Sequence, residues 1–237
     1  MKVNLFLAGL TVLAVLGLGS ARLSAAEEDG VALAIVYDTS GSMKDPVRDS
    51  NGKSCPKFVI ANRALVAVAQ QLQSFATNSA AAHSRKLHTG LLIFEGEGVR
   101  PAIPFGPFDA AAIQKFANQF SSPSGNTPLG NALRVAAQSV MDSPLPRKHV
   151  LVITDGMNTA GPTPAVVLPR LKQQAEQKQT SFSVHFVAFD VDAKVFAPLK
   201  RLGATVVGAA DEKQLDTQLQ FILQRKILLE DEEPNKP

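Results

Sequence analysis

Beyond residue 30, hydrophobic positions along the chain follow two alternating patterns. Unbroken apolar runs of about four to eight residues are typical of strands covered on both faces. Apolar residues at every third or fourth position are typical of helices that bury one face. The runs predict strands over 31–37, 91–94, 149–154, 182–189 and 204–207, and a further strand over 99–103 beside 91–94. The spacing predicts helices over 57–76, 110–120, 129–141, 164–179 and 212–229.

This alternation of strands and helices predicts the fold class. Buried strands separated by helices favour a doubly wound α/β domain, with a mainly parallel central sheet flanked by helices on both faces. We assign residues 27–229 to this one domain, because about 45% of the chain is hydrophobic and can fill a sizeable core. Residues 230–237 (EDEEPNKP) are charged and interrupted by proline, and they predict a disordered tail.

The first residues have the pattern of a leader rather than of a folded element. Met1 and Lys2 form a short basic start, residues 3–19 are almost wholly apolar, and residues 24–26 (SAA) offer a small-residue cleavage pattern. We interpret residues 1–26 as a signal peptide, which predicts a periplasmic or secreted protein without membrane contact after cleavage. An uncleaved N-terminal membrane anchor is the alternative, because the apolar run is just long enough to span a bilayer.

Charge and cysteine content limit the partners that the domain can have. Without Lys2 and Arg22 the remaining chain has 22 basic and 21 acidic side chains. No basic run stands out, so the sequence argues against a nucleic-acid surface. Cys55 is the single cysteine of the chain, which excludes an intrachain disulfide. We expect a monomer and leave open a dimer linked through Cys55.

Small oxygen-bearing residues follow the predicted strands at three places. Asp38-Thr39-Ser40-Gly41-Ser42 follows the strand over 31–37, and Asp155 follows the strand over 149–154. The segment 124–130, with Thr127 inside it, leads into the helix over 129–141. In doubly wound sheets, the functional crevice lies beyond the carboxyl ends of the strands. These three segments are therefore expected to meet there.

The combined residues suit a hard divalent cation such as Mg²⁺, which prefers oxygen ligands and keeps several of its waters. We expect the hydroxyls of Ser40, Ser42 and Thr127 to bind the ion directly, while Asp38 and Asp155 hold metal-bound waters and orient the hydroxyls. An ion held mainly by neutral groups keeps most of its positive charge and remains electrophilic. A carboxylate from a partner protein, supplied by Asp or Glu, then becomes a favourable further ligand.

The order of these five residues resembles the metal-ion-dependent adhesion site (MIDAS) of von Willebrand factor type A domains. Asp38-x-Ser40-x-Ser42, then Thr127, then Asp155 match its five positions, and the stretches NTPLGNAL and VLVITDGMN are similar to compact bacterial members. The resemblance covers residues 30–228. It implies a protein-binding module that depends on Mg²⁺ or Mn²⁺ and is usually not an enzyme, with a last helix that shifts in members that switch affinity.

The segment 44–57 departs from the family pattern, because it is longer than the usual short link between the metal loop and the first helix. It is rich in turn-forming residues and must leave from the metal face. We hypothesise that it helps to select the partner, with Arg48 and Lys53 flanking an incoming carboxylate. The alternative is a solvated loop with no role in binding.

Two alternatives remain open, one outside the class of binding modules and one within it. A phosphotransferase- or esterase-type hydrolase could use Asp38 or Ser42, but the second acid of a D-x-D pair would be residue 40, which is Ser, and a G-x-S-x-G elbow is missing. Within the binding class, cell adhesion competes with an accessory role in assembling an extracytoplasmic complex. The sequence shows no stalk, repeat or wall-sorting tail, which favours the accessory role.

Other polar residues have simpler interpretations. The four histidines (His83, His88, His149 and His185) lack the spacing of a zinc site. Asp190 and Asp192 follow the strand over 182–189, and we expect them to cap loops rather than to bind a second cation.

Overall fold

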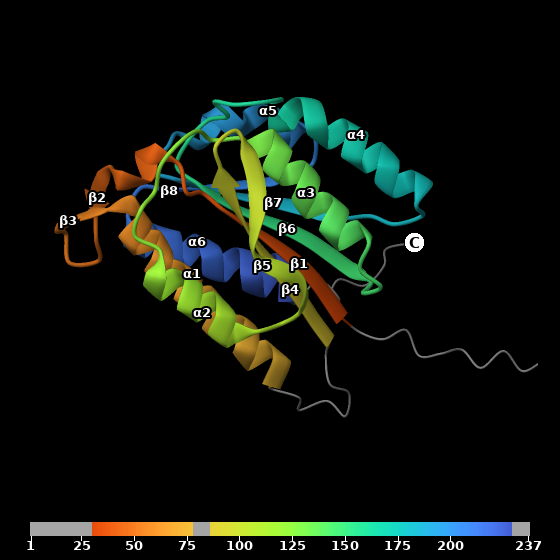
Figure 1. Cartoon of the computed structure of the whole chain (residues 1–237), viewed down its shortest axis with the longest axis horizontal. Coiled ribbons are helices and arrows are strands. Elements are labelled where there is room, and N and C mark those ends of the chain that lie inside the picture. The colour runs from red at the N-terminus through yellow and green to blue at the C-terminus, as the bar shows by residue number, and fades with distance from the viewer. Residues whose placement is uncertain (1–29, 78–85, 229–237) are drawn as a thin grey trace, which may run out of the picture.

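The computed structural model describes residues 30–77 and 86–228 (Figure 1). The predicted signal peptide (residues 1–26) and the predicted tail (residues 230–237) lie outside the described residues, and both stay predictions. Within 30–77 and 86–228, no helix has both the length and the apolar character needed to cross a bilayer.

The central sheet has six strands in the order β5-β4-β1-β6-β7-β8. All neighbouring strands are parallel except β4 and β5, which are antiparallel. The strands are β1 (Gly30–Tyr37), β4 (Lys86–Glu95), β5 (Gly98–Pro107), β6 (Arg147–Thr154), β7 (Ser183–Phe189) and β8 (Thr205–Ala209). This confirms the expected mainly parallel sheet, including the strand paired beside 91–94.

Helices cover both faces of the sheet, as Figure 1 shows. Helices α1, α2 and α6 pack on one face, and α3, α4 and α5 pack on the other. Their bounds are α1 (Lys57–Thr77), α2 (Ala110–Gln119), α3 (Leu129–Met141), α4 (Pro164–Gln177), α5 (Ala197–Arg201) and α6 (Glu212–Ile222). The short helix α5 was not predicted.

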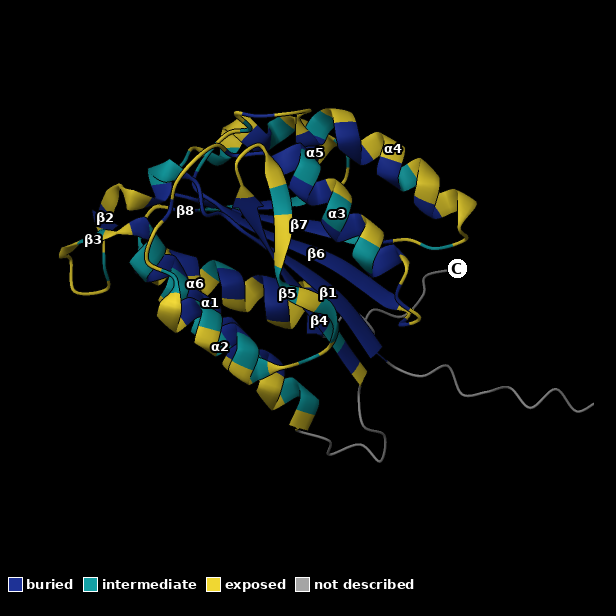
Figure 2. Cartoon of the chain, in the orientation of Figure 1, coloured by how far each residue is buried: buried dark blue, intermediate teal, exposed yellow. Residues whose placement is uncertain are grey.

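Strand β1 lies at the centre of both hydrophobic cores, and Figure 2 shows it as a fully buried strand. Its large residues, such as Leu33 and Ile35, face α1 and α6, whereas Ala32 and Ala34 face α3. Burying a Leu or Ile side chain stabilises the fold by about 1.5–3 kcal/mol. The small side chains on the other face let the alanine-rich helix α3, with Ala136 fully buried, pack close to the sheet.

Successive strands are added first on one side of β1 and then on the other, so the order of the strands switches between β1 and β6. The chain leaves β1 through α1 to reach β4 on one side, while β6 pairs with β1 on the other side. A doubly wound sheet binds its ligands at such a switch point, beyond the carboxyl ends of the two strands. Asp38 and Asp155 directly follow these two strands, so the fold brings them together.

Two segments differ from the sequence prediction. Residues 46–56 contain a small antiparallel hairpin, made of β2 (Pro46–Arg48) and β3 (Ser54–Pro56), instead of an irregular loop. Helix α6 ends at Ile222, where a helix of wider turns, η3 (Leu223–Leu228), continues it. The Arg147 guanidinium donates to the carbonyls of Ile227 and Leu228, at 3.4 and 3.3 Å.

Candidate metal centre

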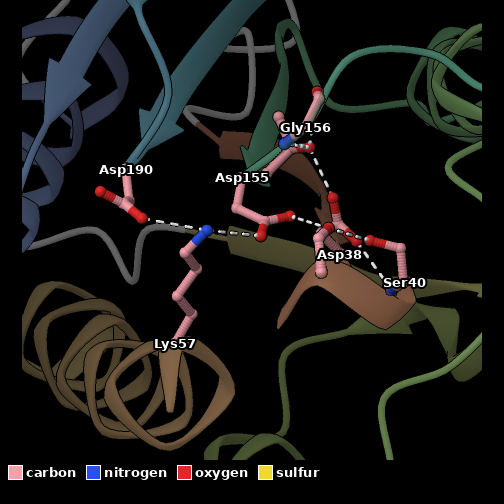
Figure 3. A network of polar contacts seen from close by, with 8 residues as sticks. Asp38, Ser40, Lys57, Asp155, Gly156 and Asp190 are labelled. Atoms are coloured by element: carbon pink, nitrogen blue, oxygen red, sulfur yellow. Dashed lines mark hydrogen bonds and ion pairs between the residues drawn. The ribbon is translucent and has the colours of Figure 1, made fainter. Parts of the chain in front are cut away.

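Asp38 is fixed in place at the carboxyl end of β1. Its backbone N–H donates to the Ile153 carbonyl, and its side chain is fully buried. One carboxylate oxygen accepts from the Ser40 backbone N–H at 2.8 Å, and the other accepts from the Thr154 hydroxyl at 2.6 Å (Figure 3). These bonds hold the loop after β1 in a tight turn.

The two serines of this loop lie beside each other, and Ser42 contacts Asp155. The Ser42 hydroxyl donates to Asp155 Oδ1 at 2.8 Å, and the Ser40 and Ser42 hydroxyl oxygens lie 3.1 Å apart. Ser42 belongs to a short 3-10 helix, η1 (Gly41–Lys44). Because Ser42 gives its hydrogen to Asp155, its oxygen can only accept from Ser40, and a second lone pair remains available to a cation.

The third predicted segment joins the same site. The Gly125 carbonyl accepts from the Gly41 N–H at 3.1 Å, and Gly125 adopts a φ of 81°, which favours glycine. Thr127 is 3% exposed, and a side-chain carbon added at Gly156 would lie 3.8 Å from both the Thr127 and the Ser42 hydroxyl oxygens. The structure therefore gathers Thr127 with the other predicted site residues.

The side chains present fit a hard cation better than a soft one. Three hydroxyls and two carboxylates offer oxygen alone, which suits Mg²⁺ or Mn²⁺. Among the described residues, no three His, Cys, Asp or Glu side chains form a metal-binding group. A cation at this place would depend on the hydroxyls of Ser40, Ser42 and Thr127, as the sequence predicts.

The charge balance also fits a cation. Burial, and then the neighbouring Asp155 carboxylate, raise the pKa of Asp38 to about 6. The described donors to Asp38 are a backbone N–H and neutral hydroxyls, so they do not offset its charge. A divalent cation would remove the electrostatic cost of holding two carboxylates in a buried place.

Lys57 is the site residue that the sequence analysis missed. It is 6% exposed, and its ammonium lies 3.1 Å from Asp155 Oδ2 and 3.0 Å from Asp190 Oδ2 (Figure 3). Burial disfavours the charged ammonium, but the two carboxylates outweigh it and raise the pKa of Lys57. The sequence contained one indication of this contact. A lysine at the first position of a helix lies at the positive end of the helix dipole, which is unfavourable unless a carboxylate lies nearby.

Arg48 and Lys53 lie on the β2–β3 hairpin, which projects beside the sheet in Figure 1. Both side chains are exposed, and Arg48 donates to the Gly52 carbonyl within the same hairpin at 3.4 Å. Glu212 at the start of α6 fixes the hairpin, because it accepts from the Ser50 N–H at 2.7 Å and from Arg63 at 3.0 Å. Their role in partner selection stays a prediction.

The other polar residues partly follow expectation. Asp192 caps the short helix η2 (Ala193–Phe196) by accepting from the Lys194 N–H, as a loop-capping residue should. Asp190 instead forms the ion pair with Lys57 and has a positive φ of 53°. His149 and His185 are buried core residues, whose rings stack with centroids 5.5 Å apart.

An apolar surface lies beside the candidate metal centre. Met157, two residues after Asp155, is 61% exposed, and Val195 is 39% exposed. Both line a cavity of about 260 Å³, together with Leu129, Asn158, Thr163, Pro164, Ala165, Phe196, Pro198 and Leu199. Exposed methionine at a concave apolar surface is common at protein-binding sites.

Comparisons with known proteins bear on the fold and the family. The family model for the von Willebrand factor type A domain matches residues 32–220. No curated protein matches the sequence.

Solved structures with a similar fold include two pilus proteins and a protein of the mussel byssus. The PilB minor pilin from Streptococcus sanguinis has a TM-score of 0.61 and 15% identity, covering 82% of this chain and 60% of the pilin. The von Willebrand factor domain of the type V pili tip protein Mfa5 from Porphyromonas gingivalis has a TM-score of 0.57 and 13% identity, covering 83% and 95%. The mussel byssus proximal thread matrix protein 1 with a zinc-occupied MIDAS motif has a TM-score of 0.57 and 18% identity, covering 83% and 48%.

At these identities, the likeness to solved structures shows the fold alone. The chain also spans less than two thirds of the pilin. The family model carries the assignment, because its match extends over most of the sequence and includes all three loops of the candidate metal centre. The chain belongs to the von Willebrand factor type A domain family.

Proposed function

We propose that this chain is an exported protein-binding module in which a Mg²⁺ or Mn²⁺ ion at Ser40, Ser42 and Thr127 binds an acidic residue of a partner protein. One observation carries the proposal: the Ser42 hydroxyl donates to Asp155 and lies 3.1 Å from the Ser40 hydroxyl oxygen. This arrangement leaves hydroxyl oxygens, rather than carboxylates, to face a cation. Asp38 and Asp155 serve to orient them.

The ligand type explains why a partner carboxylate would bind. A bound divalent cation supplies a concentrated positive charge, and neutral hydroxyl ligands leave most of that charge uncompensated. The buried carboxylates of Asp38 and Asp155 already accept hydrogen bonds from Ser40, Thr154 and Ser42. An Asp or Glu from another protein can therefore add the missing negative charge.

The surface around the site supports a protein as the partner. Met157 and Val195 expose apolar side chains at the edge of an apolar cavity next to the site. A protein segment that brings a carboxylate could cover this surface and gain from its burial. The projecting β2–β3 hairpin, with Arg48 and Lys53, offers basic groups to the same partner.

The hydrogen bonds favour binding over hydrolysis. A serine nucleophile needs a base that accepts its proton, and this base is usually a histidine. Ser42 donates instead to Asp155, and a carboxylate is a weaker base than an imidazole. His149 and His185 are buried in the sheet against each other. Both oxygens of Asp38 accept hydrogen bonds and are fully buried, which makes Asp38 a poor nucleophile.

The leader-like N-terminus supports export, and pilus proteins among the structural neighbours are consistent with a role outside the cytoplasm. We favour an accessory role in assembling an extracytoplasmic complex over adhesion to another cell.

Affinity purification from the exported fraction tests this function. The protein is used as bait with Mg²⁺ and again with EDTA, beside a Thr127→Ala bait as the matched control. We expect proteins that are retained with Mg²⁺, released by EDTA and lost with Thr127→Ala. Retention of the same proteins in EDTA would show that binding does not depend on the metal.

A further inference from the structure

Lys57 brings a positive charge into direct contact with the candidate metal centre. Its ammonium is 3.1 Å from Asp155 Oδ2 and 3.0 Å from Asp190 Oδ2, and the residue is 6% exposed. Its position is well defined by the backbone, because the Lys57 N–H donates to the Asp45 carbonyl at 3.0 Å. The residue thus connects α1 to the ends of β6 and β7 (Figure 3).

Both carboxylate oxygens of Asp155 are engaged by this chain. Oδ1 accepts from the Ser42 hydroxyl, and Oδ2 accepts from the Lys57 ammonium. An ammonium held against a carboxylate lowers the negative potential that the carboxylate offers to other cations. It also costs energy to pull the carboxylate away from its buried partner. Asp155 is therefore restrained from moving onto a cation as a direct ligand.

We propose that Lys57 is a positioning residue that holds Asp155 away from direct metal ligation, so that the bound ion keeps its affinity for a partner carboxylate. This inference rests on the proposed function and adds a control over it. Compared with a site that lacks this ammonium, the site with Lys57 binds its metal less tightly and the partner carboxylate more tightly. Asp190 shares the ammonium with Asp155 and offsets part of its positive charge.

The cluster has a charge excess that agrees with this role. Asp38, Asp155 and Asp190 bring three carboxylates, while Lys57 brings one ammonium. Without Lys57, the excess negative charge would attract a cation more strongly and would neutralise more of its charge. The metal affinity would then rise while the affinity for an incoming carboxylate would fall.

A purely structural role for Lys57 makes a different prediction. If the lysine only ties α1 to the sheet, then its loss would lower stability and disturb the site. Metal affinity would then stay the same or decrease. The direction of the change in metal affinity separates the two roles.

The experiment uses the full chain and the variant Lys57→Met, which keeps a long side chain without the charge. Mn²⁺ affinity is measured by electron paramagnetic resonance, and acetate is then titrated onto the Mn²⁺-loaded protein while water proton relaxation reports displaced water. We expect Lys57→Met to bind Mn²⁺ about tenfold more tightly, given the removal of a nearby charge in a partly buried site. We expect it to bind acetate at least about threefold more weakly.

Lys44→Met is the matched control, since Lys44 is an exposed lysine on the neighbouring η1 helix. Solvent screens its charge, so we expect Mn²⁺ affinity to change by less than about twofold. Unchanged or weaker Mn²⁺ binding by folded Lys57→Met overturns the inference. A tenfold gain with Lys44→Met as well would show a general charge effect, which also overturns it.

Asp190→Asn provides a second test if Lys57→Met does not fold. This variant keeps the ammonium and removes one of its two partners, so Mn²⁺ affinity should fall by about threefold. Unchanged or tighter binding overturns the inference. If the parent protein binds no Mn²⁺ at all, then the proposed function fails as well, whereas a binding parent with an unresponsive Lys57 refutes this inference alone.

Discussion

The Ser42 hydroxyl donates a hydrogen bond of 2.8 Å to Asp155 Oδ1, although the two residues are 113 positions apart in the chain. The bond joins the loop after β1 to the loop after β6, at the switch point of the sheet. It orients the Ser42 oxygen and uses one oxygen of Asp155. The metal-binding proposal depends on this relationship, because it decides which oxygens face the ion.

Replacing Asp155 with Asn should remove about half or more of the stabilisation that Mg²⁺ gives. At 100 times its dissociation constant, a ligand at one site stabilises the folded state by about 2.7 kcal/mol. Loss of an orienting carboxylate typically weakens metal binding by about 10–100-fold. At the same Mg²⁺ concentration the stabilisation should then fall to about 0.4–1.4 kcal/mol. Urea unfolding with and without Mg²⁺ measures this.

The control for this measurement is Asp142→Asn, at the exposed end of α3, where Asp142 pairs with Lys178. Its response to Mg²⁺ should equal that of the parent. An Asp155→Asn protein that gains as much stability from Mg²⁺ as the parent would place the metal elsewhere.

Replacing Thr127 with Ala should weaken metal binding without a large loss of stability. The change removes a hydroxyl ligand, and we expect about a tenfold or greater loss of Mn²⁺ affinity. Thr127→Ser keeps the hydroxyl and should bind nearly as well as the parent. Calorimetric titration of Mn²⁺ compares the three proteins. Equal affinities for the alanine and serine variants would exclude the Thr127 hydroxyl as a ligand.

The double substitution Arg48→Ala and Lys53→Ala should weaken partner binding while metal binding stays intact. Both side chains are exposed, so the free energy of unfolding should change by less than about 0.5 kcal/mol each. The control is Arg170→Ala with Lys213→Ala, which removes two exposed basic groups from helices α4 and α6. If both double variants retain the partner as the parent does, the hairpin has no part in selecting it.

Glu212 should make the docking of the hairpin sensitive to acid. Burial raises the pKa of Glu212, but the bonds from the Ser50 N–H and from Arg63 outweigh burial and lower it below the usual 4.5. The folded state therefore favours the charged carboxylate. Its contribution to stability is present above about pH 4.5 and is lost as the pH falls through the lower pKa of the folded state.

Urea unfolding between pH 6 and pH 3 tests this sign. The difference in unfolding free energy between the parent and Glu212→Gln should shrink as the pH falls. Glu176→Gln, an exposed change on α4, should show no such trend. A difference that stays constant or grows in acid contradicts the assigned role of Glu212.

The sequence predicted the parts of the site that depend on the order of strands. The buried run of β1 and that of β6 are strongly apolar, and each is followed directly by its aspartate. The parallel sheet then requires both ends to lie at one edge. The same reasoning predicted Thr127, because its segment leads into α3 from that edge of the sheet.

Lys57 could not be predicted in the same way. Its contact with Asp155 joins residues 98 positions apart, and it depends on the direction of one long side chain at the start of α1. The β2–β3 hairpin was missed for a related reason. Its strands have three residues each, and each strand includes a proline, so they lack a hydrophobic pattern of their own. Docking onto Glu212 and α1 holds them instead.

Anomalous diffraction from crystals grown with Mn²⁺ tests the central claim most directly. We predict one strong peak among the three loops, whose nearest protein oxygens are the hydroxyls of Ser40, Ser42 and Thr127, with Asp155 reached through water. No peak at these residues in Mn²⁺-saturated crystals, or a peak bonded to neither serine, would contradict the account.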